Sequence, residues 1–184
     1  MEIMKLFIEF PSLCKRFLFI TAFFLCCVED PVTVDDYSPP VVFTGLINGA
    51  YDSLGGNPQW RNSCTMVEDT LRMFFFSNGF WEKDKVRDGD LIRIDIFPET
   101  DSTENDTFLT NGRVLFHMAR YLSTNTTYNI SRNDRQSKVE MVVNRMNLVS
   151  GGEVEFSDII IQTAPLIGGG MLEVTEARIK GVIE

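Results

Sequence analysis

His117 and Cys64 are the residues of this chain whose chemistry most directly suggests catalysis. His117 is the only histidine, and Cys64 is the one cysteine outside the N-terminal segment. A nucleophile needs a base beside it, yet His117 falls in an apolar run and no recognisable motif surrounds Cys64. The sequence also lacks the glycine-rich and histidine-containing signatures of hydrolases, nucleotide-binding proteins and zinc enzymes. We therefore predict that the chain is not an enzyme and holds no zinc.

Carboxylates are numerous, with 26 Asp and Glu residues, and such residues could serve calcium binding or glycoside hydrolysis. Calcium needs clustered oxygen ligands, and glycosidases need two carboxylates at a defined separation. The acids gather in segments 84–90 and 99–106, and neither has the spacing of an EF-hand. We interpret both segments as solvated loops and expect no metal or cofactor. A hydrolase on a β scaffold stays an alternative for which the sequence selects no carboxylate pair.

Two tryptophans are candidates for contact with a ligand. Trp81 follows the Asn78-Gly79 turn signal, and Trp60 lies in another polar, glycine-rich stretch. Exposed aromatic rings can stack on sugars, whereas buried rings would only anchor loops. The expected partner is a glycan or a protein at the cell surface. The chain has a formal net charge of −9 and lacks the basic surface that nucleic-acid binding requires. We therefore exclude nucleic acid as a partner.

The elements that must position these residues are predicted to be strands. Gly, Asn, Asp and Pro recur at short intervals, and residues 91–97 alternate between apolar and polar. Segment 113–122 fits a helix or a strand, and its surroundings favour a strand. Residues 48–58 are expected to form turns, and residues 99–110 an exposed loop. Strands are predicted at 41–47, 70–77, 91–97, 113–122, 126–131, 138–149, 153–162 and 171–183, the last with a bulge near Glu176.

About eight strands without a convincing long helix predict an all-β domain. A β-sandwich is the favoured architecture, and a lipocalin-like β-barrel is the alternative. In a barrel, the 15 Phe and 8 Met residues would line a cavity for a small apolar ligand, and the protein would be a carrier. A third alternative is a subunit of a surface structure whose strand edges pair between copies.

The N-terminal segment resembles an export signal. Lys15 and Arg16 precede the apolar run 17–25, which is too short to span a bilayer and ends at the pair Cys26-Cys27. The alternatives are a buried element for the run and buried or disulfide-bonded thiols for the cysteines. Residues 27–40 combine acidic side chains with three prolines and predict an extended tether.

An apolar run ending at cysteine resembles the signals of bacterial lipoproteins, and the acidic stretch that follows resembles surface lipoproteins of the Bacteroidetes. The resemblance implies removal of a signal peptide, residues 1–26, and attachment of diacylglycerol (palmitate or a similar acyl chain) to Cys27. Cys26 is the alternative, but the residue before Cys27 is the smaller one. It also implies an outer-membrane location, surface-exposed or periplasmic, with the tether 27–40 leading into a single β domain, residues 41–184.

Three short patterns resemble acceptor sites for Bacteroidetes protein O-glycosylation. They place the modified hydroxyl on Ser102, Ser53 or Thr70, and Ser102 ranks first because its loop is expected to be the most exposed. Together these observations predict an exported, lipid-anchored, non-enzymatic binding or interaction module.

Overall fold

The computed structural model describes residues 37–77, 81–83, 86–98, 107–110, 112–120 and 126–184. Their regular structure consists of strands, and no helix among these residues is long and apolar enough to cross a membrane. The strands are β1 Val41–Ile47, β2 Ala50–Leu54, β3 Ser63–Val67, β4 Thr70–Phe76, β5 Trp81–Lys83, β6 Val86–Asp88, β7 Asp90–Ile96, β8 Thr107–Thr110, β9 Val114–Arg120, β10 Thr126–Ile130, β11 Lys138–Met146, β12 Glu153–Thr163, β13 Pro165–Ile167 and β14 Leu172–Val182.

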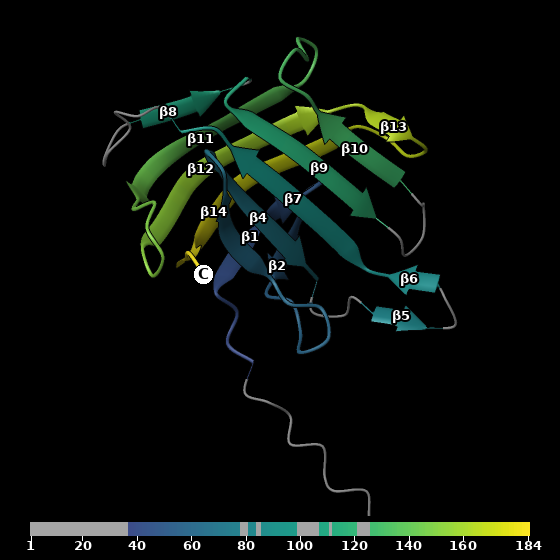
Figure 1. The fold of residues 1–184 in the computed structure, drawn as a ribbon. Helices are drawn as coiled ribbons and strands as arrows, with labels where there is room; N and C mark the ends of the chain where they lie inside the picture. The colour runs from purple at the N-terminus through teal and green to yellow at the C-terminus, as the bar shows by residue number, and fades with distance from the viewer. Residues whose placement is uncertain (1–36, 78–80, 84–85, 99–106, 111, 121–125) are drawn as a thin grey trace, which may run out of the picture. The chain divides into compact units, whose positions relative to one another are not determined.

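Twelve of these strands form two antiparallel sheets of six strands each (Figure 1). Sheet A has the order β2-β1-β14-β12-β11-β8, and sheet B has the order β13-β10-β9-β7-β4-β3. The strands β5 and β6 form a separate hairpin. Sheet B lies in front of sheet A in Figure 1, and the predicted β-sandwich is confirmed. The alternative of a lipocalin-like barrel is wrong, because the two described sheets keep separate edges and do not close on each other.

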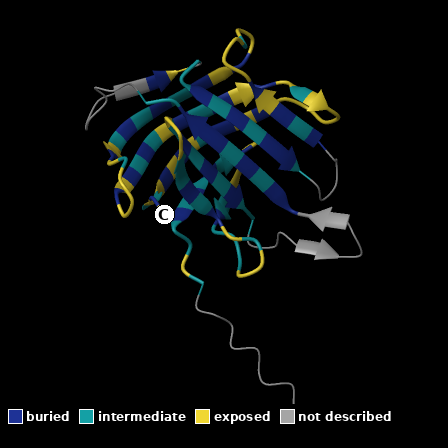
Figure 2. Cartoon of the chain, in the orientation of Figure 1, coloured by how far each residue is buried: buried dark blue, intermediate teal, exposed yellow. Residues whose placement is uncertain are grey.

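The core lies between the sheets and follows from alternation along the strands. In β1 and β4, every second residue is buried, and Figure 2 shows the same banding over both sheets. The Phe43 ring of sheet A and the Phe75 ring of sheet B meet across the core, with their centroids 5.7 Å apart. Each fully buried large apolar side chain stabilises the fold by about 1.5–3 kcal/mol. Large apolar side chains therefore pack between the sheets, where the carrier alternative expected them to line a ligand cavity.

Asn62 connects β1 and β2 of sheet A to β4 of sheet B. Its side-chain NH2 group donates to the backbone carbonyls of Val41 and Leu54, each at 2.7 Å. Its side-chain oxygen accepts from the backbone N–H of Phe76 at 2.9 Å. Asn62 is 1% exposed, so these bonds satisfy an amide that would otherwise be costly to bury.

The last residues of the predicted tether make contact with the β domain. The hydroxyl of Tyr37 accepts a hydrogen bond from the backbone N–H of Asn62, and the carbonyl of Pro40 accepts one from Val182. The predicted signal peptide 1–26 and tether residues 27–36 lie outside the described residues.

The eight predicted strands correspond to β1, β4, β7, β9, β10, β11, β12 and β14, and the hairpin of β11 and β12 is confirmed. The expected turn at 48–58 contains β2, and the expected loop at 99–110 contains β8 at its end. Both of these strands are outermost in sheet A, where one side stays unpaired and polar residues are tolerated. The bulge near Glu176 is confirmed, since Glu176 has a φ of 52° and pairing shifts beside it.

Candidate ligand-binding groove on the outer face of sheet B

The residues singled out from sequence do not form one site. Ser53 lies on β2 and Thr70 begins β4, both half-buried. Trp60 is half-buried before β3, and its ring lies 5.7 Å from that of Phe76, which makes it a loop anchor. Trp81 begins β5.

Cys26, Cys27 and Ser102 lie outside the described residues, so lipidation and modification at these positions stay predictions.

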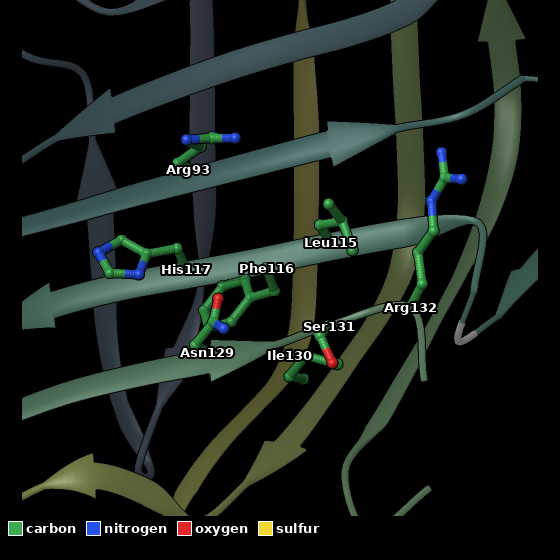
Figure 3. A pocket seen from close by; sticks show the side chains of 8 residues that line it. All are labelled: Arg93, Leu115, Phe116, His117, Asn129, Ile130, Ser131 and Arg132. Atoms are coloured by element: carbon green, nitrogen blue, oxygen red, sulfur yellow. The ribbon is translucent and has the colours of Figure 1, made fainter. Parts of the chain in front are cut away.

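A cavity of about 270 Å³ opens on the outer face of sheet B, and we call it the β9–β10 groove (Figure 3). Phe116 and Ile130 point into the core and therefore contribute backbone, whereas the other lining residues offer side chains. The groove is lined by Arg93, Leu115, Phe116, His117, Asn129, Ile130, Ser131 and Arg132.

Strand register builds this groove. Arg93 on β7 pairs with His117 on β9, and His117 pairs with Asn129 on β10. These three residues therefore form one row across three strands, on the face opposite the buried isoleucines of β7. β10 ends at Ile130, which pairs with Phe116, so Leu115 has no partner from β10. The end of β10 leaves the hollow beside β9.

Arg93 is held at the groove by Asp95. Asp95 is 2% exposed and accepts hydrogen bonds from both Arg93 and Arg72; the Arg72 Nε to Asp95 Oδ1 distance is 3.0 Å. Burial alone would raise the pKa of Asp95, but the two guanidinium groups outweigh it and hold this pKa below its usual value. Two arginines share one carboxylate, so this cluster carries a net positive charge beside the groove.

Arg132 supplies a second cationic group. Its guanidinium carbon lies 3.6 Å from the centre of the Phe97 ring, a stacked cation–π arrangement. Among the described residues, no carboxylate forms an ion pair with Arg132. Figure 3 shows Arg93 and His117 toward one end of the groove and Arg132 toward the other, with Leu115 between them.

A second, more open cavity of about 590 Å³ adjoins the groove and shares Arg132 with it. Asn133, Asp134 and Arg135 complete its lining. Asp134 accepts a hydrogen bond from the hydroxyl of Ser137 at 2.7 Å and others from the following backbone, which lower its pKa. The groove thus continues onto the loop after β10 as a polar surface.

The charge states of His117 and Cys64 follow from their surroundings. Burial, and then the nearby charge of Arg93, lower the pKa of His117, so its imidazole is neutral at pH 7. No hydrogen bond joins this ring to another described residue, so it orients no nucleophile among them. Cys64 is fully buried, and burial raises its thiol pKa to about 12, which leaves a very small thiolate fraction at pH 7. Among the described residues, no cluster of His, Cys, Asp and Glu could hold a metal ion.

Comparisons with protein-family models, curated protein sequences and solved structures find no significant match to this chain. The groove must therefore be interpreted from its own chemistry. It presents two guanidinium groups, an imidazole, an amide and a hydroxyl around an aliphatic side chain. This combination can bind a small polar molecule through several hydrogen bonds.

Sequence reasoning found one part of this groove and missed the rest. The sequence indicates a satisfied or surface-facing histidine at 117 more than a catalytic base, and Arg93 is only a polar position in an alternating strand. Arg132 has no signal of its own, and Asn129 has only an Asn-x-Ser pattern that does not point to a groove. The alternation along each strand predicts that residues 93 and 117 point outward, but the sequence does not show that these two strands pair.

Proposed function

We propose that this protein is an exported, lipid-anchored binding or interaction module whose ligand lies in the β9–β10 groove. The observation that carries the proposal is the row of Arg93, His117 and Asn129 across three paired strands. Strands fix side chains more firmly than loops do, so a ligand meets donors that are already oriented. No step of covalent chemistry is part of this function.

The anchor is proposed from the N-terminal sequence. The apolar run 17–25 ends at Cys26-Cys27, and lipid on Cys27 would tie the chain to the outer membrane. The acids and prolines of residues 28–40 suit a spacer that holds the β domain away from the membrane surface. Stable anchoring needs more than one acyl chain, as on a diacylated cysteine. The ligand would then be a glycan or a protein outside or within the envelope.

Blocking the groove tests the binding function. Asn129 is exposed, so Asn129→Trp should fill the groove without disturbing the core. Lys180→Trp is the control, because Lys180 is exposed on β14 of the other sheet. The full-length proteins, in detergent, are applied to an array of printed glycans that includes neutral and acidic oligosaccharides.

We expect glycans bound by the wild type to be lost by Asn129→Trp, with at least a tenfold drop in signal, and retained by Lys180→Trp. Retention by both variants would place binding elsewhere and contradict the proposal. The absence of any bound glycan would contradict a glycan ligand. Circular dichroism of each variant confirms that the fold is kept.

A further inference from the structure

The charge of the groove is opposite to that of the whole protein. The chain carries a formal net charge of −9, yet the groove and its adjoining cavity contain three arginines: Arg93, Arg132 and Arg135. Asp134 is the single carboxylate among their lining residues, and it is engaged by Ser137. A cationic depression on an acidic surface attracts anions while the rest of the surface repels them.

The guanidinium of Arg132 is arranged to bind an oxyanion. Its face is covered by the Phe97 ring, so its N–H groups, which lie in the guanidinium plane, point away from that ring. In-plane N–H pairs match the two oxygens of a carboxylate in a bidentate geometry. Arg93 uses its Nε and one terminal nitrogen for Asp95, and its other terminal nitrogen makes no hydrogen bond to a described residue.

The rest of the groove suits the body of a sugar. At about 270 Å³, the cavity is slightly smaller than the range of drug-sized pockets, so it fits a ligand of monosaccharide size. Asn129, Ser131 and neutral His117 offer donors and acceptors for hydroxyl groups. The side chain of Leu115 provides an aliphatic surface for the C–H groups of a ring.

Building on the proposed binding function, we infer that the β9–β10 groove recognises a carboxylated saccharide of the uronic-acid class. The carboxylate lies against Arg132, and the ring hydroxyls lie against Asn129 and His117. The open cavity along Asn133 and Arg135 leaves room for the next sugar of a chain.

Calorimetric titration of the full-length protein in detergent tests this inference. The probes are a galacturonic-acid tetramer, neutral maltotetraose and inorganic phosphate. We expect the acidic tetramer to bind at least tenfold more tightly than maltotetraose, and phosphate at equal concentration not to displace it. The affinity should fall as salt rises, because the carboxylate contact is screened.

Two arginine variants remove the same charge from different faces. Arg132→Ala should weaken binding of the acidic tetramer at least tenfold, whereas Arg178→Ala, on the exposed face of β14, should leave it unchanged. Arg132→Lys keeps the charge but loses the planar fork, so it should recover only part of the affinity. Melting temperatures of all variants control for folding.

Each other outcome separates this inference from the function on which it rests. Equal binding of maltotetraose, lost in Asn129→Trp, would overturn the acidic specificity and leave the groove as a binding site. Displacement of the tetramer by phosphate would overturn the specificity for a saccharide and leave the groove as an oxyanion site. Equal losses in Arg132→Ala and Arg178→Ala would show long-range attraction only and overturn the carboxylate contact. No binding of any probe would overturn the inference.

Discussion

Asp95 shows how a single residue determines the form of the groove. Its carboxylate lies between Arg72 and Arg93 and has almost no exposure to water. The paired arginines offset the cost of burying this charge, and in return Arg93 is held in place beside His117. From sequence, Asp95 and Arg93 were only the polar positions of an alternating strand, since pairing with Arg72 depends on the neighbouring strand.

The lowered pKa of Asp95 predicts how the free energy of unfolding changes in acid. Its folded pKa is lower than its unfolded value, near 3.9 for a free aspartate. The ionised form therefore stabilises the fold above that value, and this contribution is lost as the pH falls through the folded pKa. We expect Asp95→Asn to lower the free energy of unfolding by about 1–2 kcal/mol at pH 7, with the difference shrinking below pH 4.

Urea unfolding from pH 7 to pH 2.5 measures this difference. Asp69→Asn is the control, because Asp69 is exposed and Asn suits its turn equally well. A gap between wild type and Asp95→Asn that stayed constant over the whole pH range would contradict the linkage to ionisation.

At the scale of elements, the predictable strands are those whose own sequence shows a clear apolar pattern. β7 alternates isoleucine with polar residues, and β12 contains three consecutive isoleucines. The sequence predicts a turn at β2, whose residues are mostly polar or small, and a loop at β8, which follows an acidic and polar stretch. Both are outermost in sheet A. Whether an outermost strand forms depends on its single neighbour more than on its own composition.

The bulge between β1 and β14 depends on one glycine. A Cβ atom on Gly45 would lie 2.5 Å from the Cβ of Ala177 and 2.7 Å from its Cα. Pairing of the two strands shifts between Thr44 and Leu46, so Gly45 faces the bulge. We expect Gly45→Ala to destabilise the fold by about 1–3 kcal/mol, because the backbones must separate to admit a methyl group.

Gly170→Ala is the matched control for that substitution. Nothing lies within 4 Å of the Cβ position of Gly170, so a methyl group enters open space. Urea unfolding at pH 7 should show Gly45→Ala well below the wild type and Gly170→Ala close to it. Equal stabilities for the two variants would contradict the close approach of β1 and β14.

At the scale of the whole molecule, the fold was more predictable than the site. Turn signals and alternation indicated two layers of strands, and buried apolar positions on both sheets then define one core. The groove needed the alignment of Arg93, His117 and Asn129, which come from separate strands. One sequence does not reveal how strands pair, so the row became visible only in the folded chain.

The N-terminal segment links the molecule to its proposed location. Residues 1–36 lie outside the described β domain, so the anchor is argued from sequence. The most direct test is mass spectrometry of the N-terminal peptide of the protein extracted from membranes of the cells that make it naturally. We expect a mature chain that begins at Cys27, or at Cys26, and carries acyl chains on that residue. An N-terminal peptide without lipid would show that the protein is not a lipid-anchored module.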